Sequence, residues 1–215
     1  MKLNTTVPKL CFGGSFNPVH HGHLICARHA AEQLGLASVV LIPSAHPPHK
    51  PGAADLAGVE DRVRMCRLAA GGQAAFEVND VETLRTAPSF TIDTARELAR
   101  QGWGRVNWVV GADMLRTMPS WREPEALLRE VHFVVLARPG WSFDWDTLPP
   151  AFRGLRENVV EAPLIQISAT EIRRRVVSGL PIDFLTPAPV VDYIRNTKLY
   201  HPPGTPNAGT HATTA

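Results

Sequence analysis

The sequence is poor in cysteine and contains no long apolar run. Its three cysteines are Cys11, Cys26 and Cys66, an odd number without a CxxC spacing, which argues against a disulfide framework and a cysteine zinc site. Cys11 and Cys66 fall on the apolar faces of an expected strand and helix, so we expect both in the core. No segment reaches the roughly 18–20 apolar residues of a membrane span, and the N-terminus lacks a secretory pattern. We therefore expect a cytoplasmic protein with no membrane partner.

The chain also lacks an excess of charge of either sign. Lysine and arginine number 22, aspartate and glutamate 20, and the formal net charge is +2. A protein that binds nucleic acid through electrostatics carries a strong basic excess interleaved with aromatic residues. We therefore expect no nucleic-acid partner.

What the sequence does contain is an alternation of apolar β-rich runs with helical patterns, typical of βαβ units. We expect strands over residues 9–12, 39–42, 76–78, 106–110, 132–137 and 164–167, and helices over residues 22–34, 59–70, 91–101, 111–118, 123–129, 169–178 and 190–197. This pattern predicts an α/β fold, a Rossmann-like open parallel sheet with helices on both faces, in a single domain of residues 1–200. Residues 141–158 are expected to form a helical insertion. The tail, residues 201–215, is rich in Pro, Gly, Thr and Ala and is expected to be disordered.

The first segment that could carry chemistry is GGSFNPVHHGH, residues 13–23, between the first strand and the first helix. Ligands of open parallel sheets bind at the carboxyl ends of strands, and a glycine turn before a helix offers backbone N–H groups to phosphate. His20 and His23 are three residues apart and project to one side of a helical turn, whereas His21 points elsewhere. The alternative is a capped turn with solvated histidines. No cysteine or carboxylate stands at ligand spacing nearby, so we predict no metal ligands in the chain.

Two shorter segments have similar potential. PPHK, Pro47–Lys50, lies in a long loop after the second strand, where Lys50 could reach a polyphosphate or the loop could simply be exposed. ISATEIR, Ile167–Arg173, lies where the last strand passes into a helix. Ser168 and Glu171 have the spacing of a capping box, which is a sufficient structural reason for both. Thr170 and Arg173 are left over, and a hydroxyl and a guanidinium at a helix N-terminus suit a phosphate.

GGSFNPVHHGH and ISATEIR together match the two signatures of the nucleotidylyltransferase superfamily. Within it the chain resembles the bacterial nicotinate-nucleotide adenylyltransferases, through PPHK and three further segments. These are APSFT (residues 87–91), WVVGADML (residues 108–115) and PSW (residues 119–121). The resemblance extends from about Leu10 to Tyr200.

The resemblance implies an enzyme that transfers the adenylyl group of ATP to nicotinate mononucleotide, forming deamido-NAD and pyrophosphate in NAD biosynthesis. The acceptor phosphate would attack the α-phosphate directly and in line, with Mg²⁺ held mainly by phosphates and water. Catalytic roles are implied for His20, His23 and Arg173. The implied ATP-binding residues are Gly14, Ser15, Phe16, His20, His23, Lys50, Gly111, Asp113, Ser168, Thr170 and Arg173. For Asp113 an equal alternative is an acid favoured by the dipole of a first helical turn.

For the nicotinate nucleotide, the implied residues are Thr91, whose helix start could receive the carboxylate, and Trp121, which could stack on the ring or belong to the core. Arg122 departs from the family, whose bacterial members often have an aromatic residue there. We expect Arg122 to contact the ring or the carboxylate and to sharpen the preference for the acid over the amide. Two alternatives stay open: the same chemistry on nicotinamide mononucleotide or phosphopantetheine, and a non-catalytic nucleotide-binding regulator. The sequence leaves the oligomeric state open.

Overall fold

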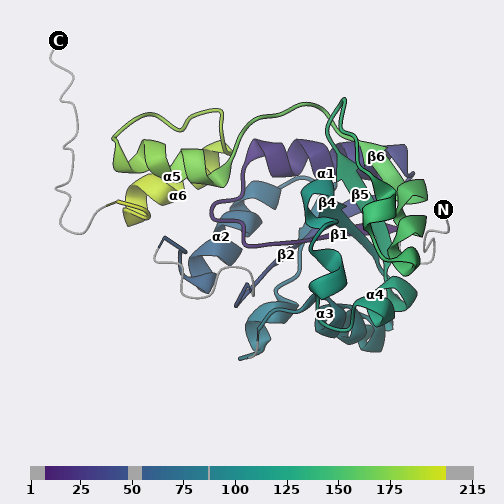
Figure 1. Cartoon of the computed structure of the whole chain (residues 1–215). Coiled ribbons are helices and arrows are strands. Elements are labelled where there is room, and N and C mark those ends of the chain that lie inside the picture. Colours follow the sequence, from purple (N-terminus) through teal and green to yellow (C-terminus); the bar gives the residue numbers. More distant parts are fainter. Residues whose placement is uncertain (1–7, 48–54, 87, 202–215) are drawn as a thin grey trace, which may run out of the picture.

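The computed structural model describes residues 8–47, 55–86 and 88–201 and is built around a six-stranded sheet (Figure 1). The strands are β1 (Lys9–Gly14), β2 (Ser38–Pro43), β3 (Phe76–Val78), β4 (Asn107–Gly111), β5 (His132–Ala137) and β6 (Val159–Glu161). Their spatial order is β3-β2-β1-β4-β5-β6, and every neighbouring pair is parallel. The predicted parallel α/β sheet is therefore confirmed.

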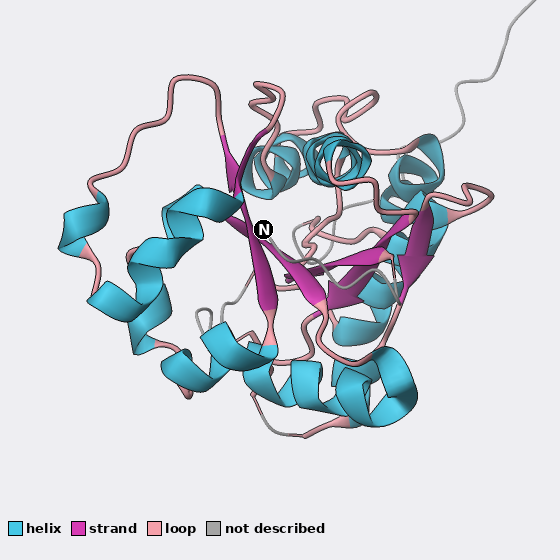
Figure 2. Ribbon diagram, turned by 90° about the vertical axis from the view of Figure 1, so that its right-hand side faces the viewer, coloured by secondary structure: helices cyan, strands magenta, loops and turns pink. Residues whose placement is uncertain are grey.

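Helices cover both faces of this sheet, as predicted, and Figure 2 shows the strands lying between them. One apolar core joins the sheet to α1 (His21–Gln33), α2 (Val59–Ala70), α5 (Ala169–Val177) and α6 (Ala188–Thr197). The other core joins it to α3 (Thr91–Leu98), α4 (Pro124–Glu130) and the 3-10 segment Pro150–Asn158. None of the helices within the described ranges has the length and apolar character needed to cross a membrane.

Alternation along the strands explains why two separate cores form. Leu10 on β1 and Leu41 on β2 are buried in the first core, whereas the next residues, Cys11 and Ile42, are buried in the second. Successive side chains of a strand point to opposite faces. A strand with apolar residues at every position therefore suits a sheet that is covered by helices on both faces. Cys11 and Cys66 are buried, as predicted from their patterns.

The predicted last strand, residues 164–167, is wrong. The sixth strand is β6, in which Val159 and Val160 pair with Val135 and Leu136 of β5. The ladder ends with the bond from Ala162 N to Ala137 O, and Pro163 follows directly. Residues 164–167 continue as extended chain without strand pairing.

Three helical predictions differ from the structure in length or type. The helix expected to Gln101 is α3 followed by a π-helical segment, Ala99–Trp103, in which Gly102 has a φ of 88°. Instead of one helix after β4 there are two 3-10 turns, Ala112–Met114 and Met118–Ser120. The expected insertion at residues 141–158 is helical, but in 3-10 form. Of the predicted tail, only His201 lies within the described residues.

Candidate active site

The sheet topology creates a site between β1 and β4, where the chain order reverses. Neighbouring connections leave this point in opposite directions, which opens a crevice at the carboxyl ends of the strands. Two cavities occupy it. Cavity 1 has about 570 Å³ and is lined by residues that include Gly13, Glu82, Phe90, Thr91, Trp108, Trp121 and Arg122. Cavity 2 has about 510 Å³ and is lined by residues that include Asn17, His20, His23, Asp113, Arg138, Ser168, Thr170 and Arg173.

The two cavities share a wall. Phe12, Ser15 and Gly111 line both of them, and these residues come from β1, the turn after it, and the end of β4. Volumes between roughly 300 and 1,000 Å³ suit small ligands. Two ligands, one in each cavity, would therefore meet beside Ser15 and Gly111.

The end of β1 and the turn after it contain a closely packed glycine and a strained phenylalanine. A Cβ on Gly13 would lie 2.4 Å from Cζ2 of Trp108, so a glycine lets the indole close over the strand. Phe16 is buried and has a φ of 44°, a strained left-handed conformation for a bulky residue. The peptide bond between Asn17 and Pro18 is cis. This turn carries Ser15 to the junction of the cavities.

His20 and His23 form a stacked pair on cavity 2, with ring centroids 3.6 Å apart. His20 is the N-cap of α1, and its Nδ1 accepts a hydrogen bond from the backbone N–H of His23 at 3.3 Å. An accepting Nδ1 requires that the neutral ring carry its proton on Nε2. Burial, with a smaller contribution from His21, lowers the pKa of His20 from 6.5 to about 4, so the ring is neutral at pH 7.

Gly22, between the two histidines, is part of this arrangement. A Cβ there would lie 3.0 Å from His20 Nδ1 and 3.4 Å from the carbonyl oxygen of Ile167. The spacing HHGH thus has a steric reason, because the His20 ring lies against the bare backbone of the helix start. The rings of Phe12 and Phe16 meet His23 edge-on, at 5.7 and 5.2 Å, and fix its orientation.

The start of α5 faces the histidines across cavity 2. Ser168 caps the helix, as predicted, and its Oγ accepts from the N–H of Glu171 at 3.2 Å. The Glu171 carboxylate accepts two hydrogen bonds from Arg174. Arg173 donates to the carbonyl oxygen of Asn17 at 2.8 Å and forms an ion pair with Asp55. The segments of residues 13–23 and 167–173, which lie far apart in the sequence, thus border the same cavity.

Asp113 lies in the 3-10 turn after β4 and borders cavity 2. Its carboxylate folds back over Gly111, where a Cβ would lie only 2.3 Å from Oδ1. Asp113 is exposed, so the carboxylate is accessible to a ligand. It is also in the first turn of its helical segment, so both sequence interpretations of Asp113 are compatible with its position.

Cavity 1 gathers the residues that were expected at the nicotinate nucleotide. Thr91 is the first residue of α3, and Trp121 and Arg122 come directly before α4. The guanidinium of Arg122 lies 5.1 Å from the centroid of the Phe90 ring. Phe90 therefore provides an aromatic surface that the sequence analysis did not identify.

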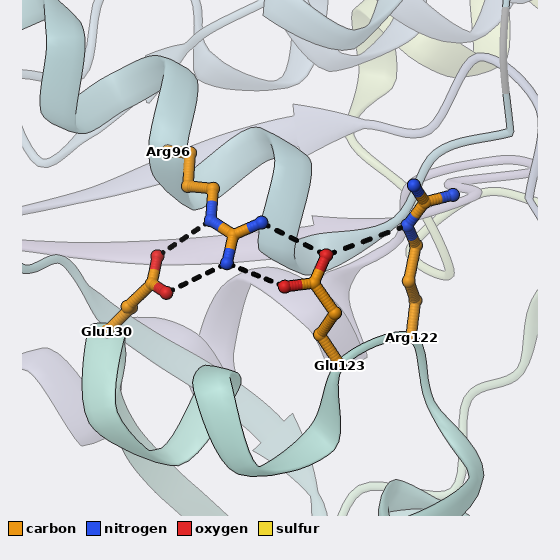
Figure 3. A network of polar contacts seen from close by, with 4 residues as sticks. All are labelled: Arg96, Arg122, Glu123 and Glu130. Atoms are coloured by element: carbon orange, nitrogen blue, oxygen red, sulfur yellow. Dashed lines mark hydrogen bonds and ion pairs between the residues drawn. The ribbon is translucent and has the colours of Figure 1, made fainter.

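An ion-pair network links the elements that carry these residues (Figure 3). Arg96 of α3 donates two hydrogen bonds to Glu123 and two to Glu130, on either end of α4. Nε of Arg122 lies 4.0 Å from Oε1 of Glu123. These bonds lower the pKa values of Glu123 and Glu130, while the pKa of Arg96 is raised. Arg96 thereby joins the last turn of α3 to both ends of α4.

Two buried charged residues of the site were missed by the sequence analysis. Arg62 of α2 is 1% exposed and donates to the carbonyl oxygens of Ser15, Ser44, Ala45 and Ala57, which joins the first turn to the segments after β2 and before α2. Glu82 is 3% exposed, lines cavity 1 and accepts from Thr94 Oγ at 2.7 Å. Burial raises the pKa of Glu82. Arg62 had a signal, since it follows Val59 by three residues and precedes Cys66 by four on the apolar face of its helix.

The structure brings together nearly all of the predicted site residues. Gly14 and Ser15 line cavity 1, and Ser15, Phe16, His20, His23, Gly111, Asp113, Ser168, Thr170 and Arg173 line cavity 2. Lys50 falls outside the described residues. Across the part of the chain that the structure describes, no group of three or more His, Cys, Asp or Glu residues could hold a metal ion.

Comparisons with known proteins agree with this geometry. A model of the cytidylyltransferase-like family matches residues 11–175. A protein of Opitutus terrae named "Probable nicotinate-nucleotide adenylyltransferase" is 40% identical over 191 residues, covering 88% of this chain and 96% of that protein. One of Herpetosiphon aurantiacus with the same name is 38% identical over 192 residues, covering 87% and 96%.

Solved structures show the same fold. Nicotinic acid mononucleotide adenylyltransferase of Plasmodium falciparum, complexed with NaAD, superposes with a TM-score of 0.68 at 18% sequence identity, covering 89% of this chain and 97% of that one. The sequence signatures, the paired cavities and the curated relatives agree, and the chain belongs to the nicotinate-nucleotide adenylyltransferase family within the cytidylyltransferase-like proteins.

Proposed function

We propose that this protein transfers the adenylyl group of ATP to the phosphate of nicotinate mononucleotide, producing deamido-NAD and pyrophosphate for NAD biosynthesis. The observation that carries the proposal is the pair of cavities that meet at Phe12, Ser15 and Gly111. ATP would occupy cavity 2 and the mononucleotide cavity 1, so that their phosphates meet at the shared wall. The names of the relatives, and the NaAD complex of the Plasmodium enzyme, support this assignment.

The reaction needs alignment and charge stabilisation more than it needs a nucleophilic side chain. An oxygen of the acceptor phosphate bonds to the α-phosphorus, the bond to the bridging oxygen breaks, and pyrophosphate leaves with the electron pair. The acceptor phosphate has a second pKa of about 6, so it is already ionised at neutral pH and no base must remove a proton. The protein's contribution is to hold two polyanions in line.

His20 is the proposed catalytic donor. Its neutral ring presents Nε2–H in cavity 2, because Nδ1 is engaged by the backbone of His23. A preoriented donor that meets charge developing on the α-phosphate lowers the barrier. His23 stacks on His20 and supports it while bordering the nucleotide.

The remaining phosphates are assigned to the helix start opposite. Ser168, Thr170 and Arg173 would hold the β- and γ-phosphates, with Gly14, Ser15 and Phe16 receiving phosphate oxygens along the first turn. Gly111 and Asp113 would contact the adenosine, and Lys50 is proposed to assist from its loop. In cavity 1, Thr91 would receive the nicotinate carboxylate, and Trp121 and Arg122 would flank the ring.

Mg²⁺ is the proposed companion of ATP. The residues that border the phosphate side of cavity 2 are mainly His20, His23, Arg173 and hydroxyls, which suit phosphate oxygens better than a cation. The ion would thus be held by phosphate and water, with Asp113 within the same cavity, and it would neutralise charge on the phosphates. We further propose that residues 1–200 form the working unit, and that it works in the cytoplasm, where its free cysteines stay reduced.

Pyrophosphate release from the purified protein with Mg-ATP tests the proposal. Nicotinate mononucleotide, nicotinamide mononucleotide and 4′-phosphopantetheine are supplied in parallel. The proposal predicts turnover that favours the nicotinate nucleotide by about tenfold or more, a difference of ~1.4 kcal/mol. His20→Ala should lower kcat by roughly 10²–10³. Turnover with phosphopantetheine alone, or ATP binding without any turnover, would show a different acceptor or a regulator.

A further inference from the structure

The guanidinium of Arg173, proposed above to hold phosphate, is already engaged by a carboxylate of the same chain. Its Nη2 forms a hydrogen-bonded ion pair with Oδ2 of Asp55. The Arg173 side chain is only 13% exposed, whereas that of Asp55 is 60% exposed. The aspartate therefore reaches the arginine from the solvent side, and Arg173 itself also borders cavity 2.

The position of Asp55 is fixed by the backbone around it. Asn17, which is 3% exposed, donates from Nδ2 to the carbonyl oxygen of Asp55 at 2.8 Å. Its Oδ1 accepts from the N–H of Ala57 at 3.0 Å and from the hydroxyl of Tyr200 at 2.8 Å. The Asp55 backbone is thus anchored to the same turn that carries the nucleotide-binding residues, and its carboxylate is held close to Arg173.

The two terminal nitrogens of Arg173 have different partners, so one hydrogen bond can be exchanged while the other is kept. Its Nη1 donates to the carbonyl oxygen of Asn17 at 2.8 Å, so the guanidinium stays in place when Nη2 changes partner. Carboxylate and phosphate oxygens compete for the same N–H donors of arginine, and phosphate carries more charge. Ser168 and Thr170 border the same cavity and would hold the rest of the anion.

We infer that Asp55 is an internal competitor of the phosphate groups for Arg173, and that it weakens the binding of ATP and pyrophosphate and speeds the release of pyrophosphate. The inference rests on the proposed function, because it takes cavity 2 as the site of the phosphates. A competitor that weakens substrate and product alike raises the KM for ATP and prevents pyrophosphate from trapping the protein.

The test is the affinity for inorganic pyrophosphate, measured by calorimetry in the presence of Mg²⁺. Asp55→Asn keeps the size of the side chain and removes its charge. An exposed ion pair is worth up to about 1 kcal/mol, or roughly fivefold in affinity. We expect the Kd of pyrophosphate to fall about three- to fivefold, and the inhibition of turnover by pyrophosphate to strengthen equally. Asp183→Asn is the matched control. Asp183 is 45% exposed and pairs with Arg195, and neither residue lines cavity 2. This variant should change neither the Kd of pyrophosphate nor its inhibition of turnover.

A double-mutant cycle assigns the effect to Arg173. In an Arg173→Gln background, Asp55→Asn should give no gain in pyrophosphate affinity, since nothing is left to compete for. The inference is overturned if Asp55→Asn leaves the affinity unchanged or weakens it, because Asp55 would then be neutral or would orient Arg173. It is also overturned if the gain persists without Arg173. Because pyrophosphate binding requires no acceptor, tighter binding together with no turnover of nicotinate mononucleotide would reject only the proposed acceptor.

Discussion

The backbone N–H of His23 determines which ring nitrogen of His20 carries the proton. The N–H of His23 occupies Nδ1, the proton stays on Nε2, and burial keeps the ring neutral with a pKa of about 4. A neutral donor is available over the whole range in which the acceptor phosphate is ionised. At the residue scale, the cap of α1 thus orients the proposed donor before any ligand binds.

The low pKa of His20 predicts a dependence of stability on pH. Between pH 4 and 6.5 the unfolded chain binds a proton at His20 that the folded chain does not, so acidification favours unfolding. From pH 7 to pH 5 this group alone should lower the free energy of unfolding by roughly 2 kcal/mol. His20→Asn keeps an oxygen that can cap the helix but removes the titration.

Chemical denaturation at pH 7 and pH 5 measures this difference in both proteins. Between pH 7 and pH 5 the wild type should lose roughly 2 kcal/mol more of its free energy of unfolding than His20→Asn. The two proteins share all other titrating groups, so the difference reports on His20. Equal losses would show that His20 titrates normally in the folded protein. A histidine resonance titrating near pH 4 in the NMR spectrum would identify the group.

Arg122 gives a prediction for substrate preference. Its guanidinium lies over Phe90 and at the limit of ion-pair distance from Glu123, so its charge is available at the mouth of cavity 1. Arg122→Ala should lower the ratio of kcat/KM for the acid over the amide, by about three- to fivefold. Parallel kinetics with nicotinate and nicotinamide mononucleotide provide the ratio. An unchanged ratio would remove Arg122 from the recognition of the carboxylate.

At the scale of elements, the contact between α3 and α4 sets the shape of cavity 1. Arg96 bonds to Glu123 and Glu130, while Thr91 and Trp121 stand at the adjoining ends of these segments. Arg96→Gln should raise the KM for nicotinate mononucleotide by about three- to tenfold and leave the KM for ATP nearly unchanged. Steady-state kinetics with each substrate varied in turn distinguish the two constants.

The control for this prediction is Arg100→Gln. Arg100 pairs with Glu97 within the same helical region, and its side chain is exposed. It should leave both KM values unchanged. If Arg96→Gln raised the two KM values equally, the network would serve general stability and not the shape of cavity 1.

The sequence predicted the elements whose signals are local and missed those that depend on partners far along the chain. The first helix was predicted within one residue at each end, since Gly35 with a φ of 65° ends it. The last strand was misplaced because residues 159–161 and 164–167 are both short and apolar, and only pairing with β5 distinguishes them. Glu82 and Phe90 lie in a 3-10 turn and a helix cap, where no periodicity marks them.

For the site, the motif residues could be predicted, but the residues that fix them could not. The positions of His20, His23 and the start of α5 could be predicted because each lies in a signature that is contiguous in the sequence. Asn17, Asp55 and Arg62 act through backbone carbonyls or ion pairs between distant segments. Their partners are known only when the chain is folded.

At the scale of the whole molecule, Arg62 connects the first turn, the end of β2 and the segment before α2. Its guanidinium is buried, and its partners are four carbonyl oxygens. Arg62→Met should lower the free energy of unfolding by roughly 3 kcal/mol or more, because the buried carbonyl oxygens would lose their hydrogen-bond donor. Arg62→Lys should recover only part of this loss, since one ammonium cannot reach all four. Urea denaturation checks both variants, and a loss below about 1 kcal/mol would contradict the role given to Arg62.

In the proposed reaction, ATP and the mononucleotide lie in two adjoining cavities, and the adenylyl group passes directly between them. The most direct test uses ATP made chiral at the α-phosphorus with sulfur and isotopic oxygen, with nicotinate mononucleotide as acceptor. A single in-line displacement predicts a dinucleotide with inverted configuration at that phosphorus. Retention would contradict direct transfer, because it requires two displacements and therefore a covalent intermediate on the protein.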